Sequence, residues 1–315
     1  MSDISFYGIG AMKSGTTWLW ARLSELPQYS LPYVKELHYF NRSKEYPIPY
    51  ELAPATLSQR IRKPSWVYME GKRTFDALRR GNLHEAKWMA NYALPTYTDA
   101  WYQSLFADLP GITGDITPAY SMLQRKDIER MHRISPDARI LFLIRNPIDR
   151  AWSHYRHTIN KGRIDNYAEA ENFDPDKLTE FLDSPGQELR SDYLRTLRAY
   201  GEVFPHDRII IGFFDAVVHD PRTLLGDIVT FTGGDAAAID RYCKLKKVSH
   251  PSPTVKLPPA IQARLQRKYE PMMARLADAF GGYARYWYEE TFNPGFTPPA
   301  SIDFPSTLLY QGQFS

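Results

Sequence analysis

Short, nearly continuous apolar runs recur along the chain, and segments with a helical repeat of apolar positions separate them. Such runs are typical of strands that are covered on both faces, as in a parallel sheet. Strands alternating with helices therefore predict an α/β fold, a parallel sheet flanked by helices. The predicted strands are Phe6–Ile9, Ile112–Asp115, Arg139–Ile144 and Ile209–Phe214. The predicted helices include Thr16–Glu25, a segment that begins at Pro147, and Pro221–Phe231.

A further helix is predicted from a stripe of large apolar residues that stops just before Pro205. Its members recur every three or four positions, which is the spacing of one helix face. The stripe consists of Leu189, Tyr193, Leu197, Tyr200 and Phe204. We expect one continuous helix that packs this face on the core and is ended by the proline.

Two segments depart from the alternation of strands and helices. Residues 41–110 are rich in proline and aromatic residues and only weakly periodic, which predicts an aromatic-rich inserted cap over the sheet edge. This cap is expected to be helical in parts such as Thr96–Phe106. The tail, residues 292–315, has no clear period, so it either wraps the body or is disordered. The whole chain, residues 1–315, is predicted to be a single domain.

The composition is that of an ordinary globular protein, with 43% apolar and 24% charged residues. A net charge of +3 suits an anionic ligand but is too small to indicate a nucleic-acid partner. Cys243 is the single cysteine, so no intrachain disulfide forms and a reducing compartment is expected. No apolar run reaches the roughly 18 residues of a membrane span. The first strand begins too early for a signal peptide, so a cytoplasmic location is predicted.

The segment with the most specific chemistry follows the first strand, in Gly10-Ala11-Met12-Lys13-Ser14-Gly15-Thr16-Thr17-Trp18. Glycines let the backbone turn tightly and approach a ligand closely. The N–H groups at the helix start, together with two threonine hydroxyls, form an anion site that Lys13 completes as a point charge. A Walker A loop places its lysine after the second glycine, whereas Lys13 precedes Gly15 by two positions.

This order of residues resembles the 5′-phosphosulfate loop of the sulfotransferases that use PAPS (3′-phosphoadenosine 5′-phosphosulfate). The resemblance lies in the unbroken Lys-Ser-Gly-Thr-Thr-Trp after the first strand. It implies a P-loop-like sheet in which the loop binds the donor and Trp18 stacks on its adenine. The residues implied to bind the donor here are Lys13, Ser14, Gly15, Thr16, Thr17 and Trp18.

A second anion site is predicted at Arg145, which ends a buried strand, with Ser153 eight residues further on. Open α/β sheets bind ligands at the carboxyl ends of their strands, and a guanidinium with a hydroxyl suits a phosphate monoester. The pair resembles the motif that holds the 3′-phosphate of PAPS in the same family. Tyr193 begins a stretch that resembles the family's nucleotide-contacting helix, although core packing is an equal alternative for this residue.

The segment Lys35-Glu36-Leu37-His38-Tyr39-Phe40 offers a candidate general base. If it is extended, Glu36 and His38 point to the same side and converge. It resembles the Lys-Glu-x-His-Phe-Phe motif of the carbohydrate sulfotransferases, in which the glutamate accepts the acceptor's proton. Glu36 is therefore our first choice as the base, with His38 second.

Two later segments resemble the same family less completely. Asp115-Ile116-Thr117-Pro118-Ala119-Tyr120 is similar to its Glu-Lys-[Ser/Thr]-Pro-x-Tyr segment, but Ile116 replaces the catalytic lysine. Lys35 or a residue of the insertion could substitute for it. The basic run 244–250 stands where the family closes over the 3′-phosphate, without the usual glycine; a solvated basic surface is an equal alternative.

The resemblance predicts transfer of a sulfuryl group from PAPS to a hydroxyl or amine, with PAP released and no metal required. Residues 41–110 are then the acceptor side, and their aromatic rings suit a sugar, an aromatic or a lipid-like chain. A carbohydrate acceptor is favoured, polymer or small molecule. The alternatives are a P-loop kinase or nucleotide hydrolase using ATP and magnesium, and a nucleotide-binding module without catalysis.

Overall fold

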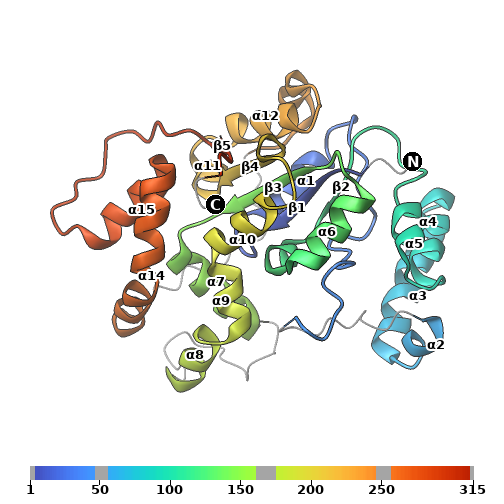
Figure 1. Cartoon of the computed structure of the whole chain (residues 1–315). Helices are drawn as coiled ribbons and strands as arrows, with labels where there is room; N and C mark the ends of the chain where they lie inside the picture. Colours follow the sequence, from blue (N-terminus) through green and yellow to red (C-terminus); the bar gives the residue numbers. More distant parts are fainter. Residues whose placement is uncertain (1–3, 47–55, 161–174, 246–256, 313–315) are drawn as a thin grey trace.

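The computed structural model describes residues 4–46, 56–160, 175–245 and 257–312, and it is built around a five-stranded sheet (Figure 1). The strand order is β2-β1-β3-β4-β5; the first four strands are parallel, and β5 runs antiparallel to β4. The strands are β1 (Ile4–Gly10), β2 (Thr113–Ile116), β3 (Arg139–Ile144), β4 (Ile209–Phe213) and β5 (Thr307–Leu309). The predicted α/β fold with a mostly parallel, P-loop-like sheet is confirmed.

Helices flank this sheet, and its central strands are almost completely buried between them. Tyr7 of β1 pairs with Ile140 of β3, and Leu141 pairs with Ile210 of β4. The helices outside the insertion are α1 (Thr16–Leu23), α6 (Arg125–Ile134), α7 (Pro147–Asn160), α8 (Pro175–Leu182), α9 (Pro185–Ser191), α10 (Tyr193–Gly201), α11 (Phe214–His219), α12 (Pro221–Phe231), α13 (Ile239–Tyr242), α14 (Pro259–Phe280) and α15 (Gly282–Phe292). Short 3₁₀ turns are η1 (Pro118–Met122), η2 (His206–Arg208) and η3 (Ala236–Ala238).

The prediction of a single helix that ends before Pro205 is wrong, because the segment forms two helices, α9 and α10, that are separated at Asp192. The side chain of Asp192 accepts a hydrogen bond from the backbone N–H of Arg195 (2.9 Å) and so caps α10. A cap of this kind favours a new helix start over continuation. Leu189 therefore lies on a different helix from Tyr193.

The insertion is more helical than its sequence suggested. In its described part it contains α2 (Leu57–Arg60), α3 (Pro64–Arg79), α4 (Leu83–Ala93) and α5 (Asp99–Ser104). Figure 1 shows these helices grouped beyond the β2 edge of the sheet. Pro64 at the first position of α3 and Asn82, which caps α4 through the N–H of Glu85, are start signals that the weak periodicity hid.

The tail wraps the body rather than being disordered in its described part. From α15 it returns to the sheet, where Leu309 pairs with Ile210 and closes the β4 edge. A three-residue strand has too little pattern to be found in a sequence, and it forms here because β4 offers unpaired backbone groups. Among the described helices, none is long and apolar enough to cross a membrane.

Candidate functional site

The parallel strands bring four chain segments to one edge of the sheet. The loop 11–15 follows β1, Thr117 follows β2, Arg145 follows β3 and Phe214 follows β4. The carboxyl ends of parallel strands share an edge, and this is where open α/β sheets bind their ligands. The two predicted anion sites therefore lie on neighbouring strands, since β1 and β3 are paired.

The loop after β1 has the backbone geometry of an anion cradle. Gly15 has a φ of 88°, and no side chain caps α1 among the described residues. The first helical hydrogen bond runs from the N–H of Leu19 to the carbonyl of Gly15 (3.0 Å). The N–H groups of Thr16, Thr17 and Trp18 are consequently available as donors at the positive end of the helix dipole.

Two predicted donor-binding side chains in this loop are buried. The Ser14 hydroxyl is completely buried, and it faces the Tyr193 hydroxyl without a hydrogen bond of normal geometry in the described part of the chain. The ring of Trp18 is 4% exposed and packs in the core. Stacking of adenine on Trp18 therefore stays a prediction that requires neighbouring side chains to move.

Phe214 joins the loop to Arg145. A Cβ on Gly15 would lie 3.1 Å from the Phe214 ring, and the Arg145 guanidinium carbon lies 4.5 Å from that ring's centre on its face. A larger residue at position 15 would push on the ring that supports Arg145. This contact brings the guanidinium of the second anion site next to the loop.

Asp149 and Tyr193 contact Arg145, and Ser153, the other residue predicted for the 3′-phosphate, lies further along α7. The Arg145 guanidinium lies 3.6 Å from the Asp149 carboxylate one turn along α7, while Ser153 is buried on the same helix. Tyr193 is fully buried and donates its hydroxyl proton to the Arg145 carbonyl (2.9 Å). In this structure Tyr193 positions the backbone of Arg145, and its ring is core.

Glu36 and His38 converge, but for a different reason from the one predicted. The Glu36 carboxylate lies 3.5 Å from His38 Nε2 and 2.5 Å from Lys35 Nζ. The segment is not an extended strand: Glu36 and His38 have φ values of 66° and 53°. Because both residues adopt the left-handed backbone conformation, their side chains point to the same place. The side-chain amide nitrogen of Asn41 lies 3.1 Å from His38 Nδ1.

Backbone strain marks this site independently. Among the described residues other than glycine, three have a positive φ: Lys13 at 72°, Glu36 and His38. Each such conformation costs roughly 1–2 kcal/mol relative to the usual regions, and strain of this kind tends to collect at functional sites. The three residues predicted to be catalytic are thus the same three that carry this strain.

The protonation of Glu36 follows from its partners. Burial tends to raise its pKa, but the hydrogen bond with His38 and the charge of Lys35 outweigh this and lower the pKa to about 2. Glu36 is therefore a carboxylate at neutral pH. It is held in an ion pair with Lys35, whose ammonium is the nearest described cation to it.

Asp115 organises the wall behind this site. Its buried carboxylate accepts hydrogen bonds from the hydroxyls of Tyr102 (2.8 Å), Thr117 (2.7 Å) and Tyr120 (2.7 Å). Burial raises the pKa of Asp115 even so. Ile116, which replaces the family lysine, is buried with its side chain against Gly8. That position is core in this protein and holds no charge.

Arg42, near the start of the insertion, contacts rings on both sides of it and was missed by sequence reasoning. Its guanidinium carbon lies 5.2 Å from the ring centre of Tyr39, 4.0 Å from that of Tyr97 and 5.1 Å from that of Trp101. All three guanidinium nitrogens are buried, and none has a hydrogen-bond partner among the residues that the structure describes. Cation–π attraction thus fastens the insertion to residues next to Glu36. A lone arginine in a sequence carries no signal for such a cage.

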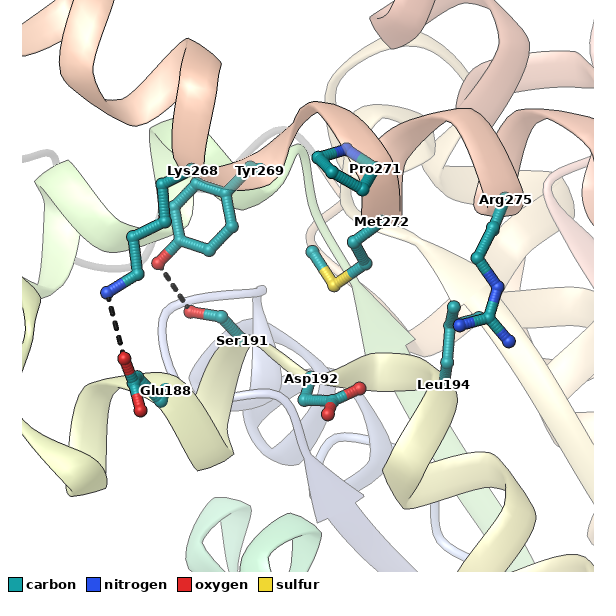
Figure 2. Close-up of a pocket in the computed structure, with 9 residues that line it drawn as sticks. All are labelled: Glu188, Ser191, Asp192, Leu194, Lys268, Tyr269, Pro271, Met272 and Arg275. Carbon is teal, nitrogen blue, oxygen red and sulfur yellow. Dashed lines mark hydrogen bonds and ion pairs between the residues drawn. The ribbon is translucent and has the colours of Figure 1, made fainter.

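A groove of about 410 Å³ lies between α14 and the junction of α9 with α10 (Figure 2). Two of its lining residues, Lys268 and Glu188, form an ion pair (3.2 Å), and the hydroxyls of two others, Ser191 and Tyr269, lie 2.9 Å apart. Its volume is within the range of small-molecule sites. None of the residues that line the groove belongs to the loop after β1.

Metal ligands and the basic run 244–250 were the remaining candidate features of the sequence. No group of three or more His, Cys, Asp or Glu side chains within the described ranges could hold a metal ion. Of the basic run 244–250, the backbone of Lys244 is tied to Glu25 (2.9 Å), while residues 246–250 lie outside the described residues.

The fold and the site combine an uncapped helix start after β1 with a strained carboxylate and imidazole, and comparison with known proteins identifies the family. The profile of the Sulfotransferase family matches residues 6–238. This chain belongs to the Sulfotransferase family.

Particular relatives are more distant. The chain is 26% identical over 211 residues to human heparan sulfate glucosamine 3-O-sulfotransferase 6. The aligned region covers 58% of this chain and 59% of that protein. With the mouse protein of the same name it shares 41% identity over 64 residues, 20% of this chain and 18% of the relative. The chain thus spans well under two thirds of the relatives it matches.

A solved structure supports the fold. The crystal structure of a sulfotransferase from Alicyclobacillus acidocaldarius superposes with a TM-score of 0.59, covering 87% of this chain and 94% of that one. At 21% identity this agreement concerns the fold alone. The family match and the superposition therefore agree on the fold of this chain.

Proposed function

We propose that this protein transfers the sulfuryl group of PAPS to a hydroxyl or amine and releases PAP. The observation that carries the proposal is the loop after β1, where no described side chain caps α1, Gly15 has a positive φ, and Lys13 stands two residues before Gly15. These residues fit a phosphosulfate, because they offer donors and positive charge without a carboxylate in the loop. Arg145 and Ser153 would hold the 3′-phosphate that distinguishes PAPS from ADP.

Charge placement supplies the chemistry. As the bond between sulfur and the bridging oxygen breaks, negative charge grows on the 5′-phosphate, and in this proposal Lys13 and the N–H groups of Thr16 and Thr17 stabilise it. Preorganised stabilisation of this kind is usually the largest contribution to catalysis. Glu36 accepts the proton of the acceptor, and His38 is the alternative base. No metal is required, since protein groups neutralise the charge that develops.

In this scheme the ion pair between Lys35 and Glu36 keeps Glu36 weakly basic before the donor binds. A carboxylate with a pKa of about 2 is a weak base, and a base works best when its pKa is near the operating pH. We propose that Lys35 turns towards the sulfuryl oxygens when the donor is bound. Glu36 then loses its cation, and its basicity rises when it is needed. This would also supply the positive charge that Ile116 cannot.

The acceptor side is assigned to residues 41–110. Its aromatic rings, with Arg42 held among Tyr39, Tyr97 and Trp101, lie directly next to the Glu36 segment. We propose a carbohydrate hydroxyl as the acceptor, in line with the glucosamine named for the human and mouse relatives. The kinase alternative requires a lysine beside the loop threonine and a metal-holding carboxylate.

The first test is thermal unfolding with PAP, ADP or AMP, each with and without magnesium. A ligand present at about 100 times its Kd stabilises the fold by roughly 2.7 kcal/mol. Stabilisation by PAP alone, independent of magnesium and lost in Arg145→Ala, supports the proposal. Stabilisation by ADP with magnesium but not by PAP would replace it with the kinase reading.

A further inference from the structure

Helix α3 has an apolar face that no described residue covers. Val67, Tyr68, Phe75 and Leu78 are 46%, 70%, 63% and 52% exposed. At about 100° per residue these side chains occupy one arc of the helix, on either side of Gly71. Figure 1 shows α3 at the periphery of the molecule, beyond the β2 edge.

The opposite face of α3 packs this helix against the rest of the protein. Trp66, Glu70 and Ala77 are buried, and α3 packs against α4. An amphipathic helix needs one apolar face to join the core, with polar residues elsewhere. The second apolar arc is therefore surplus to folding, and a contiguous exposed apolar patch is a candidate interaction site.

Positive charge borders the apolar arc. Lys72 and Arg79 lie next to it around the helix, and residues 61–80 contain six basic and two acidic side chains. One of the acids, Glu70, is buried against Arg73 (2.7 Å). The segment, which is α3 with its flanking residues, thus has a net charge of +4, although Arg80 is paired with Glu85 just beyond it (2.8 Å), whereas the whole chain has +3.

This combination selects the occupant. Apolar side chains bordered by lysine and arginine along one exposed helix are the features of a helix that lies in a lipid–water interface. A second copy of the chain is disfavoured, because a two-fold contact through α3 would set one +4 segment against another. An anionic bilayer satisfies both the apolar arc and the charge.

We propose that α3 attaches this protein to the surface of anionic membranes, with Phe75, Leu78 and Tyr68 in the interface and Lys72 and Arg79 among the headgroups. The attachment is peripheral and does not depend on the sulfotransferase reaction. It would place the insertion, and with it the acceptor side, at a lipid surface.

Co-sedimentation of the full chain with lipid vesicles tests this proposal. Vesicles of phosphatidylcholine containing phosphatidylglycerol should bind the wild type at least about tenfold more tightly than phosphatidylcholine alone, and salt should weaken the binding. The double variant Phe75→Ser, Leu78→Ser should lose binding by about tenfold or more, as should Lys72→Glu, Arg79→Glu. Val218→Ser and Leu309→Ser, at exposed apolar positions elsewhere, are the matched controls and should bind normally.

The variants lie on the surface, so their thermal unfolding should match that of the wild type and exclude misfolding as the cause. The proposal is overturned if the wild type does not bind phosphatidylglycerol vesicles, or if the α3 variants bind as well as the controls. It is also overturned if light scattering shows a dimer that the Phe75→Ser, Leu78→Ser change dissolves, since the face would then join two copies. If the wild type binds an acidic protein but no lipid vesicle, the proposal of a membrane surface is overturned as well.

Discussion

Replacing Glu36 with glutamine is the sharpest test of the catalytic assignment, because it removes the carboxylate while keeping the size of the side chain. General-base catalysis contributes roughly 10²–10⁴ in rate, so kcat should fall by this factor, about 3–5 kcal/mol in activation free energy. PAP binding should be unchanged, since Glu36 is not among the residues proposed to hold the nucleotide.

The structure predicts that stability will change little. Glu36 loses its contacts with Lys35 (2.5 Å) and His38 (3.5 Å), but its side chain is 35% exposed, so solvent screens the ion pair. Pairs of this kind contribute about 1 kcal/mol or less, which corresponds to a Tm change below about 4 °C. Loss of activity with an intact fold therefore isolates the chemical role of the carboxylate.

The pH dependence provides a second signature. The folded-state pKa of Glu36, about 2, is below its ordinary value of 4.5, so the fold binds the ionised form preferentially. This stabilisation is present above about pH 4.5 and is lost as the pH falls towards 2. The difference in unfolding free energy between wild type and Glu36→Gln should shrink over that range.

The assay follows conversion of PAPS to PAP with glucosamine-containing oligosaccharides as acceptors, beside calorimetric titration with PAP. His38→Gln is the matched variant at the neighbouring strained position. Full turnover by Glu36→Gln, together with an inactive His38→Gln, would move the base to His38. Loss of PAP binding in Glu36→Gln would show that the residue supports the donor site, and the reasoning from geometry would fail.

Three further predictions concern strain, buried hydrogen bonds and protonation. Lys13→Gly should be about 1 kcal/mol more stable than Lys13→Ala, because glycine adopts the φ of 72° without cost, while both lose turnover. Thermal unfolding of the two variants measures this, and equal stability would mean that the loop relaxes. Tyr102→Phe should lower the unfolding free energy by about 1–3 kcal/mol in urea, because the buried Asp115 carboxylate loses a donor, whereas Tyr68→Phe should have no effect. The pKa of His154 is lowered to about 3 by burial and by the charges of nearby arginines, so stability should fall as the pH drops below about 6.5. His154→Leu should flatten that slope by up to about 1.4 kcal/mol per pH unit in urea titrations, and an unchanged slope would assign the acid sensitivity elsewhere.

Several features of this protein could be predicted from the sequence because they depend on neighbouring residues. The apolar run 139–144 matches β3 at both ends, and Pro221–Phe231 matches α12. Burial on both faces and a capped helix start each depend on a few consecutive residues, so the sequence is enough to predict them. The order Lys13, Gly15, Thr16 separated this loop from a Walker A loop without any coordinates.

Other features needed the tertiary structure. The convergence of Glu36 and His38 was expected from an extended strand, but it arises from two left-handed residues that the packed surroundings impose. Left-handed geometry is unfavourable for both residue types, so no local preference predicts it. Likewise Thr307–Leu309 becomes a strand only because β4 is there to pair with it.

The same division separates the two kinds of site residue. Short-range order in the sequence was enough to nominate Lys13, Arg145 and Glu36, because turn and anion-binding chemistry resides in a few consecutive residues. Contacts between distant segments decided that Trp18 is buried, that Tyr193 holds the Arg145 backbone, and that Arg42 sits among the insertion's rings. Burial and long-range pairing depend on how the whole chain packs, and a local pattern carries no record of which distant residue will be its neighbour.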